Sequence, residues 1–360
     1  MDNSSDDTIV FDQEGVCNYC TYALKRKDEI YFPNEVGRKK MEDLIKQLKE
    51  EGKGKDYDCL MGLSGGLDSS YLAYLGYKYD LRILAFHIDD GFNTSVAEDN
   101  VRKLCEKANI SLIVEKPDSE QFIDATRAFF LAGLPSLCNP QDNIIFSYLY
   151  NNARKYEIKS FLTGGNFSLE SILQRGKGIN AADGFHIREV CKIFGTKGLN
   201  RLPIMSLVDN YIMSKYRYKL KKYRPLDYID YNRDKAIKEL NEFCDFNYYG
   251  GKHYENILTH FTQAYYLPQK FGVDKRTSHL SSMIISDQLT RDEALLELEK
   301  PLFEQNQIDR EIKFLSEKFE ISVDEFHSIM ANPARSHFDY PHSTLNKFAS
   351  VARVFRKHLF

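Results

Sequence analysis

The chain has 360 residues, of which 42% are hydrophobic and 28% charged, and this length is enough for two domains with a sizeable buried core. No stretch reaches the ~18 consecutive apolar residues of a membrane span, and the acidic start "MDNSSDDTIV" is unlike a signal peptide. We therefore expect a cytoplasmic protein with no membrane partner. Seven cysteines are too few for a disulfide scaffold, and a net charge of −3 argues mildly against a dedicated nucleic-acid binder.

The first half of the chain predicts strands that alternate with helices. Residues 1–30 have the look of a small appendage, and Glu35–Glu51 is predicted as a helix that ends at the glycines of "EGKGKD". Short apolar runs predict strands, and apolar residues three and four apart predict the helices between them. The strands are expected at 58–63, 82–88, 110–116 and 159–165, and the helices at 69–79, 95–109, 119–133 and 142–156. Such alternation implies right-handed crossovers and a parallel sheet.

The second half is predicted to be mostly helical. The pattern changes near Arg201, and the clearest helical stretch is 291–320. We expect an α/β fold in which a parallel sheet carries helices on both faces, followed by a mostly helical C-terminal region. The predicted domains are an N-terminal appendage (1–30), a ligand-binding α/β domain (31–200) and a helical domain for substrate or partner (201–360).

A glycine-rich loop, "MGLSGGLDSS" at 61–70, follows the first strand and precedes a helix. Glycines allow the backbone to turn tightly and approach a ligand, so that N–H groups of the loop and of the helix N-terminus can point at an anion. Asp68 fits an Mg²⁺ ligand or a residue that orients the loop, since a bare carboxylate repels phosphate. A plain glycine turn is the alternative. The predicted phosphate-binding residues are Ser64, Gly65, Gly66, Leu67, Asp68 and Ser69.

The loop lacks the GxxxxGK[ST] pattern of kinases and GTPases. Its "SGGLDS" resembles instead the SGGxDS signature of the PP-loop ATP pyrophosphatases. The resemblance implies that the loop holds the pyrophosphate end of ATP while a substrate carbonyl oxygen attacks the α-phosphorus. A nitrogen or sulfur nucleophile then displaces AMP. ATP and Mg²⁺ are therefore the expected cofactors.

Two further loops follow strands of the same predicted sheet, at the edge where open α/β sheets bind ligands. "FHIDDGF" places His87 and Asp89 there, and by analogy with the superfamily the backbone near His87 meets the adenine. A solvated turn is the alternative for Asp89. "LTGGNFSLES" resembles the second phosphate- and metal-side loop of these enzymes. It contributes Gly164, Gly165 and Asn166 to ATP binding and Glu170 as an Mg²⁺ ligand, with helix capping as an equal alternative for Glu170.

A narrower resemblance covers most of the chain, from Ile9 to about Leu296. The matching stretches are "IVFDQEGVCNYC", "GLSGGLDSSYL", "LTGGNFSLESIL" and the long segment from "GGKHYENILTHF" to "DQLTRDEAL". They resemble the N-acetyl sugar amidotransferases of bacterial surface-polysaccharide and nonulosonic-acid pathways, such as lipopolysaccharide O-antigen synthesis. The resemblance implies that an acetamido group of a nucleotide-linked sugar becomes an acetamidino group through adenylation and attack by ammonia.

The chain itself has no sequence for making ammonia from glutamine. Residue 2 is Asp, where an N-terminal-nucleophile glutaminase needs Cys, and no cysteine lies in a G-x-C-x-G elbow. The resemblance implies that a separate glutaminase and an ammonia-channelling barrel supply the ammonia.

Cys17 and Cys20 form a CxxC motif with the spacing of half a zinc site. The family resemblance implies an earlier cysteine pair, which would lie upstream of the residues present here. Zinc is then expected to be absent or weakly held, and two unligated thiols are the alternative. A redox role is disfavoured, because no helix is evident directly after the motif.

The helical half contributes candidate cations for the charge that develops on the α-phosphate and on pyrophosphate. Lys252 in "GGKHYEN" and Lys275 and Arg276 in "FGVDKR" are the candidates, mainly on the strength of the resemblance, and a surface charge is the alternative for each. His253 and Glu255 could orient the amide or handle the ammonia proton, with packing or capping as the alternative.

Two other functions stay open. The stretch 213–224, "MSKYRYKLKKYR", interleaves six basic residues with three tyrosines and could bind tRNA, a sugar diphosphate or an acidic partner, or be a solvated helix. A tRNA thiolase or lysidine-type enzyme would need a strong tRNA footprint or a reactive thiol, for which Cys138 and Cys244 are candidates. The second alternative is a non-catalytic subunit that binds nucleotide only to dock a glutaminase.

Overall fold

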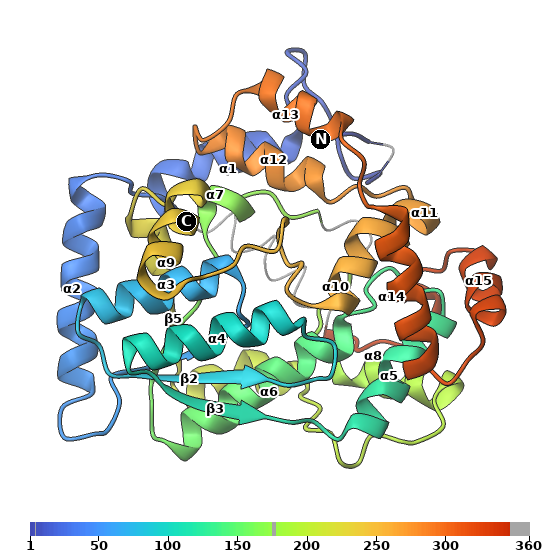
Figure 1. Ribbon diagram of the computed structural model, residues 1–360, viewed down its shortest axis with the longest axis horizontal. Coiled ribbons are helices and arrows are strands. Elements are labelled where there is room, and N and C mark those ends of the chain that lie inside the picture. The colour runs from blue at the N-terminus through green and yellow to red at the C-terminus, as the bar shows by residue number, and fades with distance from the viewer. Residues whose placement is uncertain (4, 175–177, 346–360) are drawn as a thin grey trace.

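The computed structural model describes residues 1–3, 5–174 and 178–345 (Figure 1). Within this part of the chain, a parallel sheet has the strand order β3-β2-β1-β4-β5. Its strands are β1 (Cys59–Gly62), β2 (Ile83–Ile88), β3 (Ser111–Glu115), β4 (Ser160–Leu162) and β5 (Lys221–Tyr223). The first four were predicted. The fifth has the sequence "KKY", which offers no apolar run, and it joins the sheet by pairing with β4.

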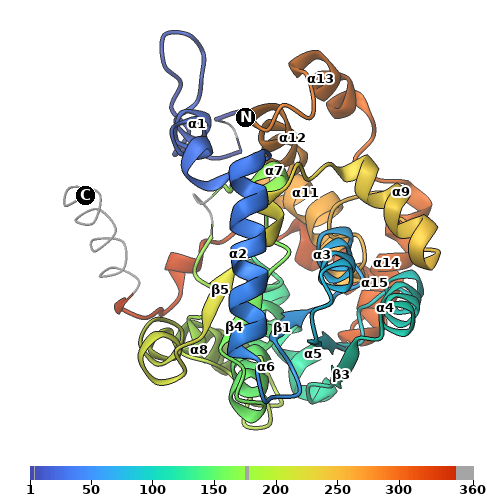
Figure 2. The same cartoon turned by 90° about the vertical axis from the view of Figure 1, so that its left-hand side faces the viewer.

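Alternate residues of the strands build two separate cores. Met61 and Ala85 point to the face that packs against α2, α3, α4 and α9, whereas Leu60 and Leu84 point to the face that packs against α6. The helices of the two faces are α2 (Glu35–Glu51), α3 (Leu67–Lys78), α4 (Ser95–Ala108), α6 (Asn139–Lys155) and α9 (Arg233–Cys244). Figure 2 shows α2 in the foreground, along the edge of this layer. The sheet is therefore covered on both sides, as predicted.

A third core of aromatic side chains joins the sheet region to the C-terminal helices. Phe129 and Phe130 of α5 are fully buried together with Phe261, Phe319 and Phe326. The helices around this core are α5 (Ser119–Leu131), α8 (Gly184–Phe194), α10 (Ile257–Phe261), α14 (Gln305–Lys318) and α15 (Val323–Ala331). The core thereby holds α10, and with it the segment that precedes α10, against the carboxyl edge of the sheet.

A further group of helices lies at the top of the molecule in Figure 1. It comprises α1 (Asn18–Ile30), α7 (Phe167–Glu170), α12 (Arg276–Ile285) and α13 (Arg291–Glu299). Helix α12 packs against both α7 and α1. The other helical segments of the described residues are η1 (Asp209–Arg217), η2 (Pro225–Tyr228), η3 (Thr262–Tyr266), α11 (Leu267–Phe271) and η4 (His337–Asp339).

The observed elements confirm the predicted fold class, with a parallel α/β sheet followed by a mostly helical region. The predicted domain limits stay a prediction, and β5 shows that the sheet extends past residue 200. The predicted 291–320 helix is two helices, α13 and α14, because "KPLFE" interrupts it. In the part of the chain that the structure describes, no helix is both long and apolar enough to cross a membrane.

Candidate active site

The glycine loop lies where the strand order reverses direction. Strands β2 and β3 lie on one side of β1 and strands β4 and β5 on the other, so the loops after β1 and β4 flank a topological switch point. Gly65 has φ +81°, and a Cβ there would lie 2.3 Å from the carbonyl oxygen of Ala97 in α4. A Cβ on Gly164 would lie 3.0 Å from the backbone nitrogen of Ser69. Glycine at 65 thus lets the first loop pack against α4, and glycine at 164 lets the second loop approach the first.

A cavity of about 650 Å³ opens between these two loops and the segment 248–255. It has many of the predicted residues in its wall and several that were not predicted. The lining residues are Ser64, Gly66, Leu67, Asp68, Ser69, Gly164, Gly165, Leu169, Glu170, Arg233, Tyr248, Tyr249, Lys252, His253 and Glu255. The structure thus brings the "SGGLDS" loop, the "TGGN" loop and the "GGKHYE" segment to one place.

Lys252 lies between the two carboxylates that the sequence predicts as Mg²⁺ ligands. Its Nζ is 3.0 Å from Asp68 Oδ2 and 3.0 Å from Glu170 Oε1. Burial favours the neutral form of Lys252, but the two carboxylates have the larger effect and raise the pKa of the lysine. Burial would also raise the pKa of Glu170, but the positive charges of Lys252 and His253 hold that pKa low. Tyr231 donates a further hydrogen bond to Asp68 Oδ1 at 2.5 Å. Both carboxylates therefore converge on one cation.

His253 and Glu255 extend this network to the phosphate-loop serine. His253 lies 3.8 Å from Glu170 Oε1 and 3.7 Å from Glu255 Oε1, and the hydroxyl of Ser64 donates to Glu255 at 3.2 Å. Burial alone would lower the pKa of His253, but its bonds to the two glutamates raise this pKa to about 9. His253 is thus an imidazolium at neutral pH.

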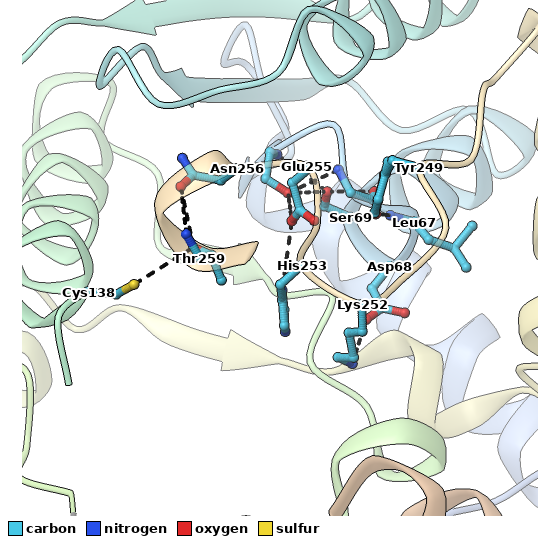
Figure 3. A network of polar contacts seen from close by, with 12 residues as sticks. Leu67, Asp68, Ser69, Cys138, Tyr249, Lys252, His253, Glu255, Asn256 and Thr259 are labelled. Carbon is cyan, nitrogen blue, oxygen red and sulfur yellow. Dashed lines mark hydrogen bonds and ion pairs between the residues drawn. The ribbon is translucent and has the colours of Figure 1, made fainter. Parts of the chain in front are cut away.

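The N-terminus of α3 already has a protein hydrogen-bond partner. The backbone N–H of Leu67 donates to the hydroxyl of Tyr249 at 2.7 Å, and the N–H of Gly66 donates to Ser64 Oγ at 3.1 Å. Figure 3 shows Tyr249, Glu255, His253 and Lys252 arranged over the start of α3. Two loop N–H groups that an anion would use are therefore occupied by hydroxyl oxygens, which an anionic oxygen can replace.

The residues present fit ATP and Mg²⁺. The donors at the metal side are carboxylate oxygens, the ligands that Mg²⁺ prefers, and they already surround a positive charge. The phosphate side offers a helix N-terminus without a side-chain cap. Asp68, Glu170 and the loop N–H groups of 64–67 are the residues that would hold the metal and the phosphates.

Three predicted ATP-binding residues have other partners. His87 is buried, with Nδ1 2.8 Å from the carbonyl oxygen of Leu63 and Nε2 3.2 Å from Asn93. Asp89 pairs with Lys116 at 2.7 Å. Neither lines the cavity. Asn166 caps α7 by accepting from the N–H of Leu169 and has no exposed surface, so its side chain is structural.

Arg276, predicted as a catalytic cation, is used to hold helix α13. Its guanidinium forms a two-pronged pair with Asp274 and donates to the carbonyl oxygens of Glu297, Leu298 and Lys300 at the end of that helix. In this structure the guanidinium thus faces a carboxylate and a helix end and does not line the cavity at the phosphate loop, and its catalytic role stays a prediction. Lys275 lies outside the first cavity and in the wall of a second one.

Cys17 and Cys20 come together, but they do so as the start of a helix. Cys17 caps α1 by accepting from the N–H of Cys20, and the two sulfurs are 3.2 Å apart. The prediction that no helix follows the motif is therefore wrong. Among the described residues, no group of three or more His, Cys, Asp or Glu is placed to hold a metal ion. The predicted zinc stays without support.

Sequence reasoning missed the tyrosines of the site. Tyr231, Tyr248 and Tyr249 lie in a chain with 23 tyrosines, so nothing in their number or spacing marks them. The one signal is that Tyr248 and Tyr249 directly precede the "GGKHYE" motif that was singled out.

A tRNA-modifying enzyme would need free basic residues or a reactive thiol. Two basic residues of the candidate tRNA-binding stretch pair with acidic side chains, and the two candidate thiols are buried. In the 213–224 stretch, Lys221 pairs with Glu51 at 2.7 Å and Arg224 with Asp227 at 2.9 Å. Burial raises the pKa of Cys138 to about 12, and burial also raises that of Cys244. Neither thiol lines the cavity, and both are in the unreactive protonated form at neutral pH.

Comparison with known proteins identifies the C-terminal part of the chain. Residues 255–354 match the family described as LPS biosynthesis protein WbpG-like, C-terminal domain. This stretch is similar to that domain, and the match confirms the predicted resemblance to a family of surface-polysaccharide biosynthesis. The matched stretch begins at Glu255, which contacts Ser64 of the glycine loop. No curated protein matches the chain in sequence.

One similar solved structure is NMN synthetase from Francisella tularensis. It is 16% identical to this chain with a TM-score of 0.36, and the match covers 79% of this chain and 97% of that one. The U34-tRNA thiolase NcsA from Methanococcus maripaludis is 14% identical with a TM-score of 0.36, covering 79% and 81%. NH3-dependent NAD synthetase from Campylobacter jejuni is 18% identical with a TM-score of 0.31, covering 82% and 97%. At such TM-scores, the description of the fold rests on the strand order and loops of this chain.

Proposed function

We propose that the protein is an ATP-dependent, AMP-forming amidotransferase that converts an acetamido group of a nucleotide-linked sugar into an acetamidino group. The observation that carries the proposal is the convergence of the "SGGLDS" loop, Asp68 and Glu170 around one cavity at the switch point of the sheet. The similarity of residues 255–354 to the WbpG-like C-terminal domain supports a substrate from surface-polysaccharide biosynthesis.

The proposed reaction has two steps. The amide oxygen of the sugar forms a bond to the α-phosphorus of ATP, and the bond to pyrophosphate breaks. Ammonia then forms a bond to the former carbonyl carbon, and AMP leaves with the former amide oxygen. A magnesium ion, when bound, neutralises the phosphate charge. Loop N–H groups of 64–67 bind the leaving pyrophosphate in place of the hydroxyl oxygens that now accept from Gly66 and Leu67, because the N-terminus of α3 favours negative charge.

Lys252 and His253 supply the positive charge of the site. Both are cations held by carboxylates beside the phosphate loop, where positive charge can stabilise the negative charge that develops on the phosphates, while Asp68 and Glu170 are the residues that would hold a magnesium ion. The carboxylate of Glu255 accepts a hydrogen bond from the hydroxyl of Ser64 and so holds this serine in place. The ammonia is supplied by a separate glutaminase with an ammonia-channelling barrel, a partner that we propose from the sequence resemblance alone.

The test is a product assay with ATP, MgCl₂ and ammonium chloride over a panel of nucleotide-linked acetamido sugars. The expected result is a sugar product in which NH replaces O, together with equal amounts of AMP and pyrophosphate, by mass spectrometry. AMP without an amidine would assign adenylation to another acceptor. ADP in place of AMP, or no ATP cleavage in the presence of a glutaminase partner, would overturn the proposal. Asp68→Asn is the matched inactive control.

A further inference from the structure

A second cavity adjoins the first and opens on the other side of the "GGKHYE" segment. It shares Leu169, Arg233, Tyr248 and Lys252 with the cavity at the phosphate loop. The segment alternates between the two: His253 and Glu255 line the first cavity and Tyr254 the second. A reaction between ATP and a second substrate needs such a neighbouring space.

The charges in the wall of this second cavity cancel in pairs, with one exception. Asp274 pairs with Arg276 at 2.8 Å, and Glu297 pairs with Lys300 at 2.5 Å. Arg233 pairs with Asp234, and Lys252 is held by the two carboxylates described above. Lys275 is the exception: among the described residues, its ammonium group has no carboxylate or hydrogen-bond acceptor within contact distance.

Lys275 also lies in surroundings that leave its charge poorly solvated. Burial lowers the pKa of the lysine, and the nearby carboxylate of Asp6, which already accepts from Thr8 and Tyr19, opposes this effect only weakly. Helix α12 begins directly after Lys275, so the positive end of its dipole lies at the same wall. An unpaired, partly desolvated ammonium is costly until an anion pairs with it.

The neighbouring imidazole adds no competing charge. His279 lies in the same wall, and burial together with the positive charge of Lys252 lowers its pKa well below the usual value. It is therefore neutral and can donate or accept one hydrogen bond. Leu280, Met283 and Leu302 complete an apolar floor. The cavity thus offers one cation without a carboxylate partner among the described residues, several neutral polar groups and an apolar surface.

We infer that this second cavity is the acceptor site and that Lys275 binds an anionic group of the acceptor, not the pyrophosphate of ATP. The inference rests on the proposed function for the identity of the reaction, but the binding site is independent of turnover. The shared chemistry is an oxyanion within reach of an acetamido group. It can come from the diphosphate of a nucleotide sugar or from a carboxylate on the sugar ring.

Equilibrium binding without ATP separates these sources. The probes are UDP-N-acetylglucosamine, which has a diphosphate and no carboxylate, N-acetylneuraminic acid, which has a carboxylate and no phosphate, and neutral N-acetylglucosamine. We expect wild-type protein to bind one charged probe, and Lys275→Gln to lose about 10- to 100-fold in affinity for it, the effect of losing a charge-assisted hydrogen bond. Lys275→Arg should restore most of the affinity. The charged probe whose affinity falls in Lys275→Gln shows whether the oxyanion is a diphosphate or a carboxylate.

The control is Lys238→Gln, which removes an exposed lysine of α9 that pairs with Glu242. Circular dichroism and thermal unfolding establish that each variant is folded. Equal affinity of wild-type protein and Lys275→Gln for both charged probes, or no binding of either by wild-type protein, would overturn the inference. A Lys275→Gln variant that loses affinity for pyrophosphate and not for the charged probes would also overturn the inference. Absence of amidine in the turnover assay would count against the proposed function and would leave these binding results intact.

Discussion

The hydroxyl of Tyr249 lies 2.7 Å from the backbone nitrogen of Leu67 and accepts its hydrogen bond at the start of α3. A side chain from the C-terminal half of the chain thus occupies an anion-binding position of the N-terminal half. An incoming phosphate oxygen must displace this hydroxyl, and the displacement has a free-energy cost.

Replacing Tyr249 by Phe removes that competitor. We expect Tyr249→Phe to bind pyrophosphate and MgATP about 2- to 10-fold more tightly, because one neutral hydrogen bond contributes about 0.5–1.5 kcal/mol. Isothermal titration calorimetry measures the difference. Tyr248→Phe, which changes the adjacent tyrosine of the same cavity, is the control. Weaker binding by Tyr249→Phe would show that the hydroxyl contacts the ligand instead of blocking it.

Lys252 holds two carboxylates together, so its loss should depend on Mg²⁺. Lys252→Met leaves Asp68 and Glu170 without the ammonium group between them, and breaking a buried pair in this way costs about 3–5 kcal/mol of unfolding free energy. Millimolar MgCl₂ should restore part of this loss by taking the place of the ammonium. Urea denaturation with and without MgCl₂ measures both effects. A variant as stable as wild type in EDTA would contradict this account.

The raised pKa of His253 predicts a pH-dependent contribution to stability. In the unfolded chain histidine titrates near pH 6.5, and in the fold the pKa of His253 is about 9. Its contribution is therefore complete below pH 6.5 and is lost as the pH rises through 9. The thermal midpoint of wild-type protein should fall toward that of His253→Asn across this range. A constant difference between pH 6 and pH 10 would refute the assignment.

Arg276 is expected to matter for folding and not for turnover. Arg276→Lys removes the two-pronged pair with Asp274 and most of the bonds to the end of α13, so the free energy of unfolding should fall by about 1–3 kcal/mol. The kcat of folded protein below its unfolding temperature should stay within a few-fold of wild type. A large fall in kcat at unchanged stability would return Arg276 to the catalytic residues.

The sequence predicted the sheet well because its first four strands are apolar runs bounded by helices, and the loop motif is specific in both composition and place. It did not predict β5, whose three residues belong to the sheet only through their pairing with β4. The sequence could not predict where the cations Lys252 and Arg276 lie, because their positions depend on contacts between distant parts of the chain. Both are basic residues in short polar motifs, and only the structure shows that Lys252 faces the phosphate loop beside α7 while Arg276 faces the end of α13.

The segment that carries Tyr249, Lys252 and Tyr254 forms a common wall of both cavities. The Tyr249 hydroxyl must leave Leu67 when phosphate arrives, and the same segment gives Tyr248 and Lys252 to the walls of both cavities. We expect occupancy of one cavity to alter affinity in the other, and this effect must be equal in both directions. Each of two ligands bound in separate cavities would thus change the apparent affinity of the other by the same factor.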